Sequence, residues 1–152
     1  MANAVLTTKR DPGYDDLPEE QYHFPQTYLR QVEAAVGDWI VYYEPRRTST
    51  DPSSRGGRQA YFATAMVDRI IGDRHRPDHF YALVSSYLDF DRPVPFAEGE
   101  QYYESGLRRA DGETSKGAFG RAVRPLPSWE YEAILAAGFS RTLHEGVPST
   151  AD

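Results

Sequence analysis

Residues 37–47 read Gly-Asp-Trp-Ile-Val-Tyr-Tyr-Glu-Pro-Arg-Arg, and this stretch is the strongest indication of the fold. A Gly-Asp turn signal precedes an unbroken run of aromatic and β-branched residues, and a proline ends the run. The pattern predicts a strand from Trp39 to Tyr43 that opens into an arginine-rich loop. Flat aromatic rings beside positive charge suit a site that stacks a nucleobase and holds its phosphates.

The two tyrosines of this strand face opposite ways, because successive side chains of a strand alternate between its faces. Trp39, Val41 and Tyr43 share one face, and Ile40 and Tyr42 share the other. The pair therefore cannot clamp one base together. We expect Tyr43, next to the arginines, to stack on a base, with Trp39 on the same face as a further candidate and Tyr42 in the core.

The rest of the chain is dominated by strands. Further strands or extended pieces are predicted over Ala4–Thr8, Gln59–Ile71, Phe80–Leu88, Arg92–Phe96 and Arg121–Arg124. Helical spacing predicts helices over Pro25–Ala35 and Trp129–Ala137. Strands this closely spaced in a short chain predict an α+β fold, a small twisted β-barrel of about five to seven strands with two flanking helices.

The length of 152 residues fits a single domain, predicted over residues 1–139. Residues 140–152 lack apolar periodicity and are predicted to be a flexible tail or linker. The sequence has no cysteine, which excludes disulfides, cysteine zinc sites and thiol catalysis. No apolar run approaches the ~20 residues of a membrane span, and the first residues lack the basic start of a signal peptide. We expect a cytoplasmic protein that does not bind a membrane.

The net charge of −6 argues against general attraction to nucleic acid, but the charge is segregated. Residues 44–59 hold four arginines against two acids, and residues 107–124 hold five basic residues against two acids. Residues 78–104 hold one arginine against six acids. One basic face is therefore compatible with the acidic total.

Signatures of enzymes are missing from the sequence. It contains no P-loop, no GxGxxG, no HExxH and no nucleophile motif of a Ser/His/Asp hydrolase. We therefore expect no catalytic residue, no cofactor and no metal.

Several motifs, taken in order, resemble the PUA superfamily. They are Tyr22-His23-Phe24-Pro25, the strand at 37–43, the segment 59–73, Tyr87-Leu88-Asp89-Phe90 and residues 117–124. Within that superfamily the chain resembles the SRA-like readers of modified cytosine found in bacterial SRA-HNH endonucleases. The resemblance spans residues 4–139.

The resemblance implies a pseudo-barrel that binds double-stranded DNA and flips one modified base, most simply 5-methylcytosine, into an aromatic pocket. Such a domain would be the recognition module of a modification-dependent restriction system. His75 and His79 do not supply an HNH signature, because Pro77 interrupts the segment between them. The resemblance therefore implies a nuclease domain that is fused to, or associated with, this recognition domain.

Asp89 follows a predicted strand, and a carboxylate there suits the exocyclic amino group of cytosine. In the resembled families the loop before the first helix approaches the pocket. That loop adds four candidates for base binding: Tyr14, Asp15, Tyr22 and His23.

Phosphate contacts need only positive charge and reach. The two basic segments supply eight candidates: Arg46, Arg47, Arg55, Arg58, Arg108, Arg109, Lys116 and Arg121.

Other functions remain open from the sequence. The chain could be a PUA/ASCH-like RNA-binding module, or it could read another modified base such as N6-methyladenine. A small-molecule hydrolase would use Asp89 or His23 as a base, and a protein-interaction module would use the aromatic surface.

Overall fold

The computed structural model describes residues 2–8, 17–45 and 59–139, and its centre is one mixed sheet. The sheet has six strands in the order β2-β5-β4-β3-β1-β8. Their bounds are β1 Asn3–Thr7, β2 Gln21–Pro25, β3 Trp39–Glu44, β4 Ala60–Gly72, β5 His79–Pro95 and β8 Val123–Leu126. Strands β1 and β3 are parallel, and the other neighbours are antiparallel.

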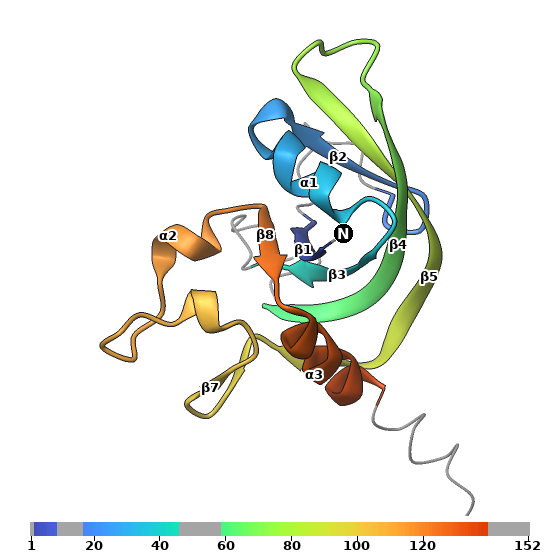
Figure 1. Cartoon of the computed structure of the whole chain (residues 1–152). Coiled ribbons are helices and arrows are strands. Elements are labelled where there is room, and N and C mark those ends of the chain that lie inside the picture. Colours follow the sequence, from blue (N-terminus) through green and yellow to red (C-terminus); the bar gives the residue numbers. More distant parts are fainter. Residues whose placement is uncertain (1, 9–16, 46–58, 140–152) are drawn as a thin grey trace, which may run out of the picture.

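The sheet curls into a half-barrel. Strands β4 and β5, of 13 and 17 residues, bend around the opening in which α1 (Leu29–Ala35) lies (Figure 1). The register between β4 and β5 shifts at three places, and each extra residue bends a strand and increases its twist. A polar seam spans the opening, because the Tyr22 hydroxyl of β2 donates to the carbonyls of Thr7 at 3.0 Å and Ala122 at 3.4 Å.

The remaining elements are short, apart from the last helix. They are the 3₁₀ helices η1 (Gln26–Tyr28) and η2 (Ser105–Leu107), the hairpin of β6 (Ala97–Glu98) and β7 (Gln101–Tyr102), and helices α2 (Lys116–Phe119) and α3 (Ser128–Gly138). Helix α3 lies against β4 and β5, on the opposite side of the sheet from α1 (Figure 1).

Two hydrophobic clusters lie on the two faces of the sheet. The inner cluster holds Tyr22, Phe24, Ile40 and Tyr42 together with the buried face of α1. The outer cluster holds Val5, Val41, Tyr43 and Tyr61 together with the buried face of α3. Alternation along β3 is therefore confirmed, since Ile40 and Tyr42 point inward while Val41 and Tyr43 point outward.

The sequence predicted most of this architecture. The strands at β1, β3, β4 and β8 and the helices at α1 and α3 are confirmed, with small differences in their ends. Two details differ. Residues 21–25, expected to be loop and helix start, form edge strand β2, and the extended piece at 92–96 is largely the end of the long strand β5. The six-stranded sheet lies within the predicted range, and its curl into a half-barrel agrees with the predicted twisted β-barrel.

Within the ranges that the structure describes, no helix has both the length and the apolar character needed to cross a membrane.

Candidate nucleic-acid interface

Three aromatic rings form a wall at one end of the inner cluster. The buried ring of Tyr42 lies 5.9 Å from the ring of Phe62, nearly parallel at 18°, and 6.1 Å from the ring of Tyr87 at 44°. Phe62 and Tyr87 are only half-buried. We call these three residues the aromatic wall. Its exposed part offers π-surface from two neighbouring strands, β4 and β5.

Irregular strand pairing places the two half-buried rings of the wall. Tyr42 pairs with Ala63 while Tyr43 pairs with Tyr61, so Phe62 is an extra residue of β4 in this ladder. On β5 the register shifts again where Thr64 and Met66 pair with Leu88 and Ser85, and Ser86 there has a φ of 54°. Such bulges re-aim side chains and are common beside functional sites. Both half-buried rings of the wall therefore lie at a register shift.

A carboxylate borders the wall. The Tyr87 hydroxyl donates to Asp89 Oδ1 at 2.8 Å, and both residues lie on β5. Burial, the hydrogen bond to Asp89 and the negative charges of Asp89 and Glu19 all raise the pKa of Tyr87. Tyr87 therefore stays protonated at neutral pH and keeps donating to Asp89. The exposed Asp89 can accept a further hydrogen bond through its second oxygen.

The structure places Tyr43 away from this wall. Its side chain belongs to the outer cluster, where it is 1% exposed and contacts the rings of Tyr61 and Phe119 and the guanidinium of Arg124. No face of Tyr43 is open to a base in this conformation. Tyr42, expected to be core alone, is buried but forms the floor of the aromatic wall. The core position expected for Tyr42 is therefore confirmed, whereas the burial of Tyr43 does not fit the stacking role expected for it.

Trp39 and Tyr22 also lie apart from the exposed part of the wall. Trp39 begins β3, at the opposite end of that strand from the arginines, and packs against the outer cluster. Tyr22 is 2% exposed and uses its hydroxyl in the seam between β2 and β8. Tyr22 thus joins β2 to the far side of the opening, and Trp39 packs on the outer face, so neither ring lies beside Phe62 and Tyr87.

His23 lies on the outward side of β2, near the β4–β5 turn. Its Nε2 is 2.9 Å from Asp73 Oδ2, and its ring stacks on Tyr81 at 4.5 Å. The side chains of His23 and Asp73 are 2% and 4% exposed, so the pair joins β2 to the turn and is closed to a ligand. Tyr14, Asp15, Arg46, Arg47, Arg55 and Arg58 lie outside the described residues, and their roles stay predictions.

The second basic segment forms an excursion from the sheet that includes η2 and α2, over residues 105–121. We call it the basic arm; it lies to one side of the half-barrel (Figure 1). Arg108, Lys116 and Arg121 are exposed, and no carboxylate of the described part of the chain pairs with them. Arg109 forms an exposed ion pair with Asp111 at 2.9 Å. Three cations of the arm thus remain available to an anionic partner.

The arm and the wall lie at the same end of the sheet. Phe119 of the arm contacts Tyr43, whose neighbour Tyr42 is the floor of the wall. The described residues that border the other basic segment, Pro45 and Gln59, lie next to this end, because β3 ends and β4 begins there. The wall lies on the inner face and Phe119 packs on the outer face, so wall and arm meet this end of the sheet from opposite faces. An aromatic and acidic surface suits a base, and a basic surface suits its phosphates.

The sequence reasoning missed Phe62 and Tyr87 as wall residues. Tyr87 precedes the predicted carboxylate by two positions, which places both on one face of a strand and could have identified it. Phe62 gave no such signal, since only the register shift turns it toward Tyr42. In the described ranges, no group of three or more His, Asp or Glu side chains could hold a metal ion.

No protein-family model matches the chain, and no curated protein matches it in sequence. Among solved structures, its fold is similar to the N-terminal domain of Staphylothermus marinus McrB, with a TM-score of 0.55 and 14% sequence identity. The match covers 90% of this chain and 94% of that chain. The likeness shows a shared fold across nearly the whole length of both chains.

Proposed function

We propose that this chain binds DNA that contains a modified base, with 5-methylcytosine as its target, and that the base leaves the duplex to stack on the aromatic wall. The observation that carries this proposal is the juxtaposition of Phe62 and Tyr87 with the open carboxylate of Asp89. The fold shared with the McrB N-terminal domain favours modified-DNA binding in restriction.

The wall and Asp89 would make different contacts with the base. Phe62 and Tyr87 supply stacking, which contributes about 1–3 kcal/mol per base in single-strand binding. Asp89 accepts from the exocyclic amino group, and a hydrogen bond to a charged group contributes about 1.5–3 kcal/mol. Together these contacts are large enough to offset the few kcal/mol that unstacking one base costs.

The methyl group itself contributes little by burial. One buried methyl is worth about 0.8 kcal/mol, which corresponds to a preference of about fourfold. A larger preference requires that the pocket also exclude other bases by shape. We therefore expect a moderate preference for 5-methylcytosine over cytosine, on top of strong binding to the flipped base.

The basic residues would contact the DNA backbone. Arg108, Lys116 and Arg121 of the arm are exposed cations, and Arg109 can exchange Asp111 for a phosphate. Arg46, Arg47, Arg55 and Arg58 are proposed for the same role from the sequence alone. In this proposal the chain is a recognition domain without catalytic residues, and cleavage belongs to a nuclease domain fused to it or associated with it.

A gel-shift panel tests the proposal. The probes are DNA duplexes that differ only in one base, namely cytosine, 5-methylcytosine or N6-methyladenine, together with single-stranded RNA, each at several salt concentrations. We expect the 5-methylcytosine duplex to bind best at every salt concentration. Equal affinity for modified and unmodified duplexes would contradict the proposal, and strongest binding to RNA would replace it.

Variants of the wall sharpen this test. Asp89→Asn and Phe62→Leu should each weaken binding of the modified duplex about tenfold, while general binding at low salt remains. Ser85→Ala is the matched control, since it also removes an exposed hydrogen bond of β5, from Ser85 Oγ to Asp68 at 2.9 Å, on the far side of the bulge. The control should bind as the unchanged protein does.

A further inference from the structure

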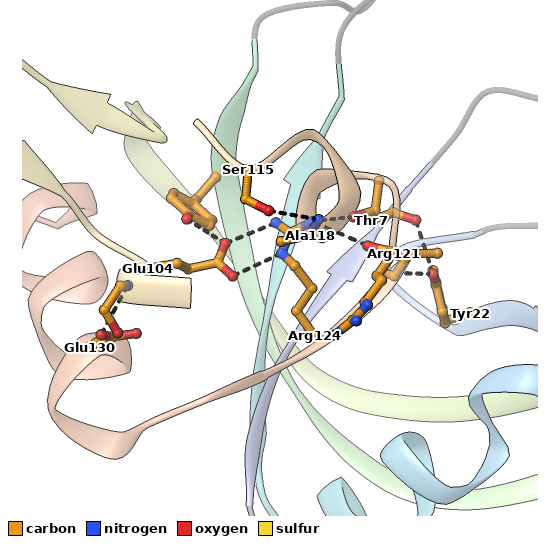
Figure 2. Close-up of polar contacts among 11 residues, drawn as sticks. Thr7, Tyr22, Glu104, Ser115, Ala118, Arg121, Arg124 and Glu130 are labelled. Atoms are coloured by element: carbon orange, nitrogen blue, oxygen red, sulfur yellow. Dashed lines mark hydrogen bonds and ion pairs between the residues drawn. The ribbon is translucent and has the colours of Figure 1, made fainter. Parts of the chain in front are cut away.

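A buried ion pair joins the basic arm to the sheet. Arg124 of β8 donates from Nε to Glu104 Oε2 and from Nη2 to Glu104 Oε1, both at 2.8 Å (Figure 2). The two side chains are 5% and 4% exposed. Burial alone would lower the pKa of Arg124, but the hydrogen bonds and charge of Glu104 outweigh it and raise that pKa. The Arg124 guanidinium therefore stays charged, and its two hydrogen bonds to Glu104 fix the geometry of the pair.

Other side chains complete the network. The Tyr61 hydroxyl donates to Glu104 Oε1 at 2.6 Å, and Arg124 Nη1 donates to Thr7 Oγ1 at 3.4 Å. Burial and the charge of Glu104 raise the pKa of Tyr61, so its hydroxyl remains a donor. The Arg124 guanidinium also lies over the ring of Tyr43 at 5.2 Å. Strands β1, β3, β4 and β8 thus all contact the same pair.

Both ends of the arm attach to this pair. Glu104 directly precedes the first arm residue, while at the other end the Phe119 ring lies 5.6 Å from the Arg124 guanidinium. Arg124 Nη1 donates to the carbonyl of Arg121 at 3.2 Å. A second buried acid, Glu130 of α3, accepts from the backbone N–H of Ser105 at 3.1 Å. Both ends of the arm are therefore fixed to the sheet by contacts with Glu104, Arg124 and Glu130.

The segment held in this way carries exposed charge. Arg108 and Arg109 line a shallow open hollow together with Tyr102 and Ser105. Lys116 begins α2, directly after the Ser115 side chain that accepts from the backbone N–H of Ala118. Leu107 is its one fully buried apolar side chain among the residues described, and Phe119 packs against the rings of Tyr43 and Phe96.

We propose that the Glu104–Arg124 pair is a clamp that positions the basic arm for contact with the DNA backbone, an inference that rests on the proposed function. A buried ion pair contributes little net stability compared with apolar side chains of the same size, so its value lies in the geometry that it fixes. An arm that is ordered beforehand loses less conformational entropy when it binds. Glu104 and Arg124 are thus positioning residues rather than DNA contacts.

The test replaces the network with apolar side chains in the triple variant Tyr61→Phe, Glu104→Leu and Arg124→Met. We expect the variant to fold, because no buried charge or hydroxyl of the trio is left without a partner. Amide hydrogen exchange over residues 105–121 should speed up at least about tenfold. Affinity for duplex DNA should fall about tenfold, and the slope of log affinity against log salt should shrink by about one for each phosphate that the arm no longer binds.

A matched control removes a different buried hydrogen bond. Thr64→Val with Tyr131→Phe deletes the 2.9 Å bond between β4 and α3, and neither residue belongs to the arm or to the Glu104–Arg124 network. This control should leave both the arm exchange and the salt slope unchanged. If the triple variant does not fold, Phe119→Ala releases one end of the arm with the ion pair intact, and it should speed up the arm exchange about threefold and reduce the salt slope.

The outcomes separate the clamp from the proposed function. Unchanged arm exchange and an unchanged salt slope in a folded triple variant, or in Phe119→Ala, would overturn the clamp. Failure of the unchanged protein to bind any duplex would overturn the proposed function instead, and faster arm exchange in the variant would then show the clamp without its DNA role.

Discussion

The two faces of the sheet accommodate polar groups differently. On the inner face, the polar atoms of the aromatic wall lie at its exposed edge, where Asp89 keeps an oxygen open. On the outer face, Arg124 and Glu104 lie within the apolar cluster and direct their hydrogen bonds to each other and to Tyr61. The inner face is therefore suited to bind a ligand, and the outer face is suited to fix the arm to the sheet. Three experiments test that division and a fourth tests a polar site at the β4–β5 turn, in order of decreasing effect.

The single substitution Arg124→Met should have the largest effect on stability. It leaves the Glu104 carboxylate buried without its cation, and breaking a buried pair in this way costs about 3–5 kcal/mol. Urea unfolding measures the loss. The triple variant described above should recover most of it, and a loss below about 1 kcal/mol for Arg124→Met would show that water reaches the pair.

Gly138→Ala should be the next most damaging change. A Cβ at Gly138 would lie 2.5 Å from two ring atoms of Phe90, where α3 meets β5. Overpacking of this kind costs about 1–3 kcal/mol. Gly72→Ala is the matched control, because a Cβ there has nothing within 4 Å. Thermal unfolding of the two variants should differ clearly, and equal melting temperatures would mean that α3 shifts freely on the outer face.

Removal of one tyrosine hydroxyl on each face compares the faces directly. Thr64 Oγ1 donates to the Ile40 carbonyl at 2.8 Å, so it accepts from the buried Tyr131 hydroxyl. Tyr131→Phe should therefore cost about 1 kcal/mol. Tyr87→Phe breaks an exposed bond and should cost less than about 0.5 kcal/mol, yet it should weaken binding of modified DNA. The reverse ranking in urea unfolding would contradict the division between the faces.

A pH titration of stability tests a third polar site, at the β4–β5 turn. The backbone N–H of His75 lowers the pKa of Asp73 below its ordinary 3.8, and the hydrogen bond with His23 lowers it further, against the effect of burial. The ionised carboxylate thus stabilises the fold above about pH 4, and this contribution is lost as the pH falls through the lowered pKa. Asp73→Asn should be less stable than the unchanged protein near pH 6, and the difference should shrink toward about pH 2. A difference in stability between the two proteins that does not change with pH would show that the charge of Asp73 does not stabilise the fold.

The strands could be predicted where burial on both sides imposes a simple pattern. Strands β1, β3 and β4 are rich in apolar and aromatic residues, and turn signals such as Gly37-Asp38 mark their ends. Strand β2 escaped prediction because it is a short edge strand with Pro25 at its end. Its partner lies some 60 positions later in the chain, so no local pattern reports the pairing.

The candidate site was predicted only in part. Asp89 was identified from its place near the end of an expected strand, and alternation correctly separated Tyr42 from Tyr43. Alternation could not say which face was the inner one, since that depends on where α1 and α3 pack. The positions of Phe62 and Tyr87 follow from shifts in register, which arise from strand pairing and leave no mark on the local sequence.

The seam of the half-barrel also bears on solubility. An open sheet has two edges, and an unpaired edge is a template on which a second chain can add its own strand. Here both edge strands contain a proline, Pro25 in β2 and Pro125 in β8, and a proline has no N–H to offer to such a strand. Ala122, just before β8, is engaged by Thr7, Tyr22 and Tyr28. The contacts across the opening and the two prolines thus leave fewer backbone groups for a second strand to pair with at the edges of the described sheet.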